Sequence, residues 1–216
     1  MNVELLTGRF QPIHNGHKKI IDSMINPIVV IVKGKKSSED KERNPLSEDY
    51  QKKLLEKVCP GVEVSVSPNG FLPGILGYFR KQGKEVTKIY AGADRINGYK
   101  SAIETANSKM PKEDQYHVKF QETERITSAS AVRKAIKEND FLTFKKLVPE
   151  QIWSEWNNLK KIFNEVTELK NFSNWLKEEV QVTTSTNNIK TAQKDQPLIN
   201  NITNRKMKKL IKMNEE

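Results

Sequence analysis

An unbroken run of β-branched residues, Ile-Val-Val-Ile-Val at positions 28–32, constrains the fold of this chain more than any other feature. A strand that faces water on one side alternates apolar and polar residues, whereas a strand that is apolar throughout is typical of a parallel sheet covered on both faces. Parallel neighbours must be joined by crossover connections, which are usually helices. The run therefore predicts an α/β domain.

Strand and helix patterns alternate along the first 148 residues, as this class of fold requires. Short apolar or alternating runs predict further strands near residues 3–6, 62–66, 89–91 and 118–120. Apolar residues at helical spacing predict helices over residues 16–25, 47–58, 75–79 and 96–106, and another that begins near residue 128. We expect a Rossmann-like parallel sheet of about five strands with right-handed crossovers over residues 1–148.

No strand pattern returns after residue 148. Apolar and aromatic residues at helical spacing predict one amphipathic helix over residues 152–163 and a second over residues 172–180. We expect these helices to pack on the α/β domain as a C-terminal extension that covers residues 149–182. The polar and basic composition of residues 183–216 predicts a flexible tail, whose amphipathic segment near Met207 is suited to folding on a protein partner.

The segment Thr-Gly-Arg-Phe-Gln-Pro-Ile-His-Asn-Gly-His at residues 7–17 lies at a predicted strand-to-helix junction. Backbone N–H groups at a helix N-terminus carry partial positive charge, and the planar guanidinium of Arg9 can hold phosphate oxygens. The imidazoles of His14 and His17 can donate further hydrogen bonds. The segment therefore predicts a phosphate site that suits a nucleoside triphosphate.

Two other interpretations of the histidine pair are weaker. Histidines in a first helical turn can simply cap the helix, but Gly8 permits close backbone approach and Gly16 leaves space for a ligand beside the two rings. A zinc site needs more ligands than His-x-x-His supplies, and the only other histidine is His117. We predict no metal site built from protein ligands.

Two later segments are expected at the same edge of the sheet, because ligands of such folds bind at the carboxyl ends of the strands. Gly92 and Asp94 follow a predicted strand, and Asp94 is a candidate either for a ribose or base contact or for the N-cap of its helix. Ser128 is a candidate N-cap, Ser130 a candidate donor, and Arg133 on the second turn can reach an anion held at that helix N-terminus.

These motifs resemble those of a known family. Residues 8–17 resemble the GRFQPxHxGH signature of nicotinamide-nucleotide adenylyltransferases, within the HxGH nucleotidyltransferase (cytidylyltransferase-like) superfamily. Residues 127–133 resemble its ISSTxxR element, with Thr127, Ala129 and Ser130 in place of the usual aliphatic residue, small polar residue and threonine. The segment Asn-Pro-Leu at 44–46 resembles the family's NPx segment, but Gln51 and Lys52 follow where an arginine is expected.

The resemblance implies transfer of AMP from ATP to nicotinamide mononucleotide, or to a similar small phosphate acceptor, with release of pyrophosphate and with Mg²⁺ as cofactor. It implies catalytic roles for His14, His17 and Arg133. The residues expected to bind the nucleotide are Gly8, Arg9, Phe10, Gly16, Gly92, Asp94, Ser128 and Ser130.

A second hypothesis comes from the Ser-Ala-Ser pattern at residues 128–130 and the Gly-Ala-Asp-Arg segment at residues 92–95. Both also resemble phage-encoded cytidylyltransferase-like proteins, some of which are linked with prohead assembly. Under this hypothesis the chain is an interaction or capsid-assembly module with weak or no catalysis.

Composition narrows the setting and the partners. No apolar run approaches the roughly 20 residues that cross a bilayer, no secretory signal precedes the first strand, and Cys59 is the only cysteine, so we expect a cytoplasmic protein. The net charge of +10 is carried partly by the tail, which lacks aromatic residues for base stacking, so we do not expect a nucleic-acid partner. The oligomeric state stays open, a homo-oligomer included.

Overall fold

The computed structural model describes residues 1–34, 39–124 and 126–186. Its strands form one sheet in the order β3-β2-β1-β4-β5, in which every pair of neighbours is parallel. The predicted Rossmann-like parallel sheet is therefore confirmed. The strands are β1 (Asn2–Gly8), β2 (Pro27–Val32), β3 (Glu63–Ser67), β4 (Glu85–Ala91) and β5 (Lys119–Glu122).

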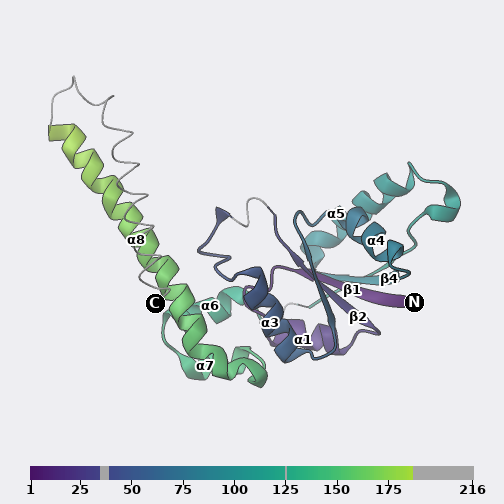
Figure 1. The fold of residues 1–216 in the computed structure, drawn as a ribbon, viewed down its shortest axis with the longest axis horizontal. Coiled ribbons are helices and arrows are strands. Elements are labelled where there is room, and N and C mark those ends of the chain that lie inside the picture. The colour runs from purple at the N-terminus through teal and green to yellow at the C-terminus, as the bar shows by residue number, and fades with distance from the viewer. Residues whose placement is uncertain (35–38, 125, 187–216) are drawn as a thin grey trace. The chain divides into compact units, whose positions relative to one another are not determined.

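Helices cover both faces of the sheet (Figure 1). The helices are α1 (Asn15–Asp22), α3 (Glu48–Val58), α4 (Leu72–Lys81), α5 (Ala93–Asn107), α6 (Ala129–Lys137), α7 (Phe141–Leu147) and α8 (Trp156–Thr186), with short 3₁₀ helices η1 (Lys112–Asp114) and η2 (Glu150–Glu155). One apolar cluster joins α4 and α5 to the sheet, and a second joins α1, α3, α6, α7 and the start of α8 to the opposite face.

The β-branched run forms β2 and is buried on both sides, as its sequence predicts. Ile28 and Val30 belong to the cluster under α4 and α5, whereas Val29 and Ile31 belong to the cluster on the other face. Residues that alternate along a strand point to opposite faces of the sheet. An apolar residue at every position therefore anchors both helical layers.

Two elements differ from the sequence-based expectations. Helix α7 was not expected; it forms because Asn139, with φ of 56°, ends the α6 segment and the Asp140 carboxylate accepts a hydrogen bond from the Thr143 N–H. The two helices expected near the C-terminus are one continuous helix, α8, because residues 164–171 contain no glycine or proline to stop it.

The chain divides into two compact units, Met1–Thr167 and Glu168–Glu216. In the first unit, Leu159 and Phe163 of α8 are buried in the core. In the second, the rings of Phe172 and Trp175 stack with their centroids 5.8 Å apart. Residues 187–216 lie outside the described part, so the flexible tail and its partner-binding segment stay predictions, as do the boundaries at residues 148 and 182.

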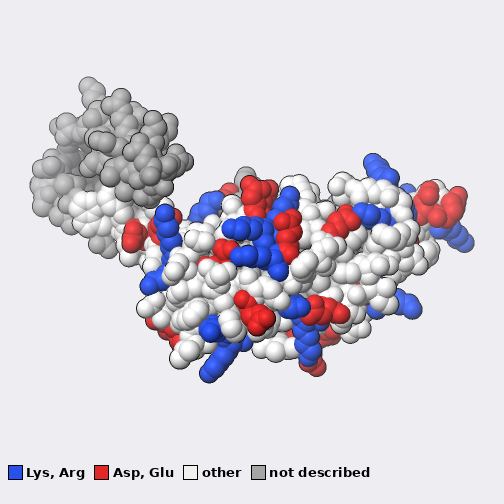
Figure 2. Space-filling view, turned by 60° about the horizontal axis from the view of Figure 1, so that its bottom comes forward, with Lys and Arg blue, Asp and Glu red and all other residues white. Residues whose placement is uncertain are grey.

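The described surface has two features that bear on partners. Within residues 1–34, 39–124 and 126–186, no helix is long and apolar enough to cross a membrane. On the face shown in Figure 2, a group of basic side chains near the middle is bordered by acidic side chains. That face therefore does not present a continuous basic track.

A buried carboxylate joins α3 to the segment that follows α7. Glu155 is 4% exposed, and its Oε1 lies 2.5 Å from Lys57 Nζ. Its Oε2 accepts hydrogen bonds from the Tyr50 hydroxyl at 2.8 Å and from Asn158 Nδ2 at 3.0 Å. Burial alone would raise the pKa of Glu155, but these hydrogen bonds outweigh burial and lower the pKa to about 2.

This shift predicts an acid-dependent loss of stability. Because the pKa of Glu155 is lower in the folded protein than in the unfolded chain, its stabilisation is present above pH 4.5 and is lost as the pH falls toward 2. Urea unfolding should give a free energy of unfolding that is about 3 kcal/mol higher for wild type than for E155Q near neutral pH. This difference should shrink as the pH falls. A gap that stayed constant down to pH 2.5 would contradict this assignment.

Candidate functional site

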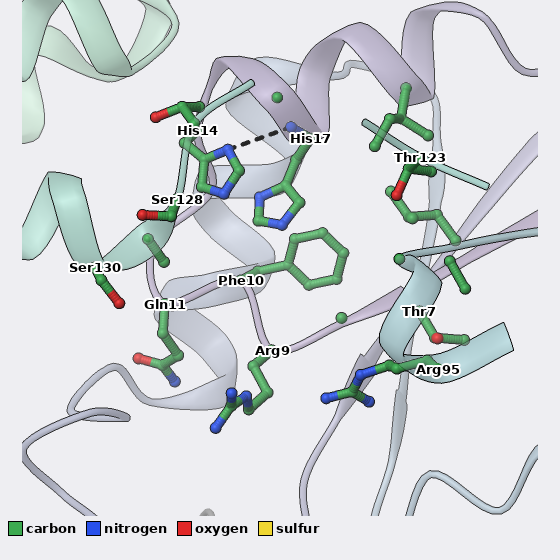
Figure 3. Close-up of a pocket in the computed structure, with 18 of the residues that line it drawn as sticks. Thr7, Arg9, Phe10, Gln11, His14, His17, Arg95, Thr123, Ser128 and Ser130 are labelled. Carbon is green, nitrogen blue, oxygen red and sulfur yellow. Dashed lines mark hydrogen bonds between the residues drawn. The ribbon is translucent and has the colours of Figure 1, made fainter. Parts of the chain in front are cut away.

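A cleft of about 840 Å³ opens at the carboxyl ends of β1 and β4. The strand order reverses between these two strands, which is where sheets of this kind bind ligands. The structure brings all of the predicted site residues to this one cleft, some of which appear in Figure 3. They are His14, His17, Arg133, Gly8, Arg9, Phe10, Gly16, Gly92, Asp94, Ser128 and Ser130.

Three helices begin at the cleft, and their N-caps are His14 for α1, Gly92 for α5 and Ser128 for α6. The Ser128 side chain accepts a hydrogen bond from the Ala131 N–H at 3.1 Å, which confirms its predicted capping role. Asp94 lies in the first turn of α5, so its alternative interpretation as the N-cap is wrong. Helix N-termini carry partial positive charge, and three of them together favour an anion.

Phe10 lines the cleft and has an unusual backbone conformation. Its φ is 44°, its side chain is 2% exposed, and its ring centroid lies 4.7 Å from that of His17. A Cβ added at Gly8 would lie 3.0 Å from this ring. Gly8 is therefore needed for the Phe10 ring to pack beneath His17.

The two histidines are stacked, with ring centroids 3.7 Å apart and planes at 18°. His14 Nδ1 accepts a hydrogen bond from the His17 N–H at 3.4 Å, so His14 also caps α1 (Figure 3). A Cβ at Gly16 would lie 3.2 Å from the His14 ring and 3.4 Å from the Thr127 methyl group. Gly16 lines the cleft, and a larger residue there would crowd the His14 ring. That Gly16 leaves space for a ligand stays a prediction.

His17 is held in its neutral form. Burial is the largest cause that lowers its pKa well below 6.5, and the neighbouring charge of His14 lowers it further. His17 Nδ1 and Thr127 Oγ1 are both buried without a hydrogen-bond partner among the described residues. Such unsatisfied atoms are uncommon in folded interiors, and each calls for a specific explanation.

The neutral state of His17 is directly measurable. In an NMR titration from pH 8 to pH 5.5, the ring signals of His17 in the folded protein should not pass through an inflection. The same titration in urea should show inflections near 6.5 for the unfolded imidazoles. An inflection of the folded His17 signal between pH 6 and 7 would contradict the burial and stacking described above.

Arg133 lies on α6, lines the cleft and is held by two hydrogen bonds. Its Nη1 donates to the Gln11 carbonyl at 2.9 Å, and its Nη2 donates to Ser130 Oγ at 3.0 Å. Burial lowers the pKa of Arg133, and the cations of Arg9 and Arg43 lower it further, against smaller opposing effects of acidic neighbours. An anion that binds among these cations relieves their mutual repulsion, so the cleft favours anion binding.

The cleft contains functional candidates that sequence analysis missed. Arg43 and Arg95 line it, and Figure 3 shows the guanidinium of Arg95 reaching from α5 into the cleft, toward the side on which Arg9 lies. Arg43 directly precedes the Asn-Pro-Leu segment and Arg95 ends the Gly-Ala-Asp-Arg segment, but nothing in the sequence alone shows that either side chain lines the cleft. Among the described residues, no group of three or more His, Cys, Asp or Glu side chains could hold a metal ion.

A family model described as cytidylyltransferase-like matches residues 5–135. The chain belongs to the cytidylyltransferase-like family. The match covers well over half of the chain and includes both the segment from Gly8 to His17 and the segment from Ser128 to Arg133. The predicted membership of the HxGH nucleotidyltransferase superfamily is thereby confirmed.

Two individual proteins are similar to this cytidylyltransferase-like chain. The phosphopantetheine adenylyltransferase of Alkaliphilus oremlandii (strain OhILAs) is 32% identical over 109 residues, which are 49% of this chain and 65% of that relative. The chain thus matches just under two-thirds of the length of this relative. A crystal structure of Thermotoga maritima TmcAL bound with alpha-thio ATP is 15% identical, with a TM-score of 0.48, over 76% of this chain and 56% of that one.

Proposed function

We propose that the protein is a nucleotidyltransferase that transfers AMP from ATP to nicotinamide mononucleotide or to a similar phosphomonoester, with release of pyrophosphate. The observation that carries this proposal is the placement of Arg133. It donates hydrogen bonds to Ser130 and to the Gln11 carbonyl, shares the cleft lining with the cations of Arg9 and Arg43, and lies near the N-terminus of α6. This donor set suits the β- and γ-phosphates of a triphosphate.

The proposed chemical step needs no protein nucleophile. An oxygen of the acceptor phosphate attacks the α-phosphorus of ATP, the bond from that phosphorus to the β-phosphate oxygen breaks, and pyrophosphate leaves. The acceptor oxygen is already anionic at neutral pH, so no proton has to be removed. Catalysis then consists of aligning the two phosphates and stabilising the negative charge on the leaving group.

Neutral His17 fits this role as a donor. An imidazole with one N–H can hydrogen-bond a phosphate oxygen, and its low pKa keeps it in the same state across the physiological range. Its ring is fixed by Phe10 on one side and by His14 on the other. A fixed donor needs little reorganisation when charge develops on the phosphates.

Mg²⁺ is proposed to enter with the nucleotide. The described residues offer no cluster of three or more acidic or histidine ligands, so a dedicated protein cage does not fit. Mg²⁺ in phosphate-transfer sites is commonly held by substrate phosphates with one or two carboxylates, and the cleft lining contains Asp94, Glu122 and Glu124. The ion supplies screening of the repulsion between the two anionic substrates.

The acceptor can be identified with a small panel. The resemblance of residues 8–17 to nicotinamide-nucleotide adenylyltransferases supports nicotinamide mononucleotide. The name of the relative from A. oremlandii makes phosphopantetheine the second acceptor to test. The family description makes CTP a nucleotide to test beside ATP. Purified protein is incubated with each nucleotide and each acceptor, and pyrophosphate and the joined product are measured by mass spectrometry.

We expect acceptor-dependent pyrophosphate release with ATP and nicotinamide mononucleotide, accompanied by NAD. Product from 4′-phosphopantetheine alone would keep the reaction class and change the acceptor. If no pair gives product and no nucleotide raises the melting temperature, the enzymatic proposal fails, because a ligand that binds only the folded state must stabilise it. That result would favour the interaction-module hypothesis.

A further inference from the structure

The backbone of the Arg9 loop is held by one buried side chain from another part of the sequence. Gln51 on α3 donates from its Nε2 to the Arg9 carbonyl at 2.5 Å and to the Phe10 carbonyl at 3.3 Å. These two residues lie between β1 and α1, so neither carbonyl belongs to a strand or helix ladder. The amide of Gln51 thus replaces the regular hydrogen bonds that this turn lacks.

A second glutamine joins the same loop to the residues that lead into α3. Gln11 is 5% exposed; its Nε2 donates to the Leu46 carbonyl at 3.1 Å, and its Oε1 accepts from the Leu46 N–H at 2.9 Å. The Gln11 carbonyl in turn accepts from Arg133. Gln51 and Gln11 therefore tie the Arg9 loop to α3 and, through Arg133, to α6.

The orientation of the Gln51 amide leaves one of its buried polar atoms without a hydrogen bond. Gln51 is 1% exposed, and its Oε1 is buried with no hydrogen-bond partner among the described residues. A buried acceptor left unsatisfied destabilises a fold, and an apolar residue of similar length would avoid that penalty. The residue present instead places its Nε2 within hydrogen-bond distance of the Arg9 and Phe10 carbonyls.

The direction of the Arg9 side chain depends on the backbone of its loop. Arg9 is exposed and lines the cleft, while its neighbour Phe10 is buried beneath His17. The direction of an exposed, flexible side chain depends strongly on the backbone that bears it. Two hydrogen bonds to that backbone therefore set where the Arg9 guanidinium can reach.

We propose that Gln51 is a positioning residue that aims Arg9 at the triphosphate by holding the Arg9 and Phe10 carbonyls. This inference rests on the proposed function, because it assigns the Arg9 guanidinium to a nucleotide phosphate. Gln51 would be the contribution of α3 to the site, because no residue of α3 is among those that line the cleft. Gln51 acts on nucleotide affinity through Arg9, without touching the nucleotide.

Calorimetric titration of the full chain with MgATP tests the proposal. Q51M removes both donors at nearly constant length, and Q51E keeps the shape while replacing the donors by acceptors. Each should weaken MgATP binding about tenfold, the loss expected when two hydrogen bonds stop fixing the Arg9 backbone. L54V, which shortens a buried apolar side chain of the same helix and leaves the Gln51 amide in place, should lower the melting temperature and leave the affinity unchanged.

The same titrations in an R9A background separate positioning from general destabilisation. If Gln51 acts through Arg9, Q51M should weaken MgATP binding less than twofold once Arg9 is gone, so the two effects are not additive. Steady-state kinetics should show the loss for Q51M mainly in KM for ATP, with a smaller change in kcat.

The outcomes are distinguishable. Wild-type protein that does not bind MgATP would overturn both the proposed function and this inference. Wild-type binding with unchanged affinity in Q51M and Q51E would overturn the inference alone. A tenfold loss that persisted in the R9A background would also overturn it, since Gln51 would then act independently of Arg9.

Discussion

Replacing Arg133 by alanine is expected to lower kcat/KM for MgATP by about 10²- to 10³-fold, the range found when one donor to a developing charge is removed. Arg133 is already fixed before substrate enters, by Ser130 Oγ and the Gln11 carbonyl. Arg9 and Arg43 line the same cleft, and their positive charges lower the pKa of Arg133, so an anion that enters is attracted by all three cations. The loss should therefore come from phosphate binding and from stabilisation of the leaving pyrophosphate.

Lys134 provides a matched control for this variant. It follows Arg133 on α6, its side chain is largely exposed, and its ion pair with Glu138 at 3.8 Å is a surface contact between residues four apart. Such pairs contribute little to stability. K134A should retain activity within about twofold, and equal losses in R133A and K134A would show that general charge, rather than the fixed guanidinium, matters. R133K should stay well below wild type because an ammonium lacks the planar fork.

Replacing His17 by alanine is expected to be the second large effect, with a loss of about 10²-fold in kcat. The ring lies between Phe10 and His14, so its removal takes away both a fixed donor and one wall of the cleft. H17N keeps a side-chain N–H donor and should recover part of the activity. Circular dichroism and melting temperature separate this effect from unfolding.

The pH behaviour of the His17 variants gives an independent check. Neutral His17 acts as a hydrogen-bond donor with no change of protonation, so wild type and H17N should have kcat profiles of the same shape from pH 6 to pH 8. A limb present in wild type and absent in H17N would assign His17 an acid or base role instead. Unchanged turnover in H17A would remove the histidine from the mechanism.

The sheet and the position of the cleft could be predicted from the sequence because both follow from local patterns. The β-branched residues at 28–32 indicate a strand buried on two faces, and the carboxyl ends of parallel strands necessarily share one edge. That geometry alone brings the segment from Gly8 to His17 close to the segments at Gly92 and Ser128. Local hydroxyl and arginine patterns then identify donors.

Other features depend on contacts between distant residues. Gln51 was notable only as a departure from a family pattern, yet its amide reaches back to carbonyls 41 and 42 positions earlier. The sequence likewise does not show that the His14 ring and the Thr127 methyl group both lie within 3.4 Å of the Cβ position at Gly16. Single-residue patterns do not determine which side chain occupies a gap.

The continuity of α8 could not be predicted from apolar periodicity alone. Apolar residues near positions 152–163 and 172–180 suggested two helices because the apolar periodicity weakens between them. Helix continuity, however, depends on the absence of a stop signal, and the intervening residues carry none. Weak amphipathicity between two apolar stretches therefore does not interrupt this helix.

Attack of an acceptor phosphate on the α-phosphorus of ATP can be followed with a radioactive label. Wild-type protein is incubated with Mg²⁺ and nicotinamide mononucleotide, and with ATP labelled either at the α-phosphate or at the γ-phosphate. We expect the α-label in the joined dinucleotide and the γ-label in pyrophosphate, at equal rates. Transfer of the γ-label to the acceptor, or release of the γ-label as orthophosphate with no joined product, would contradict it.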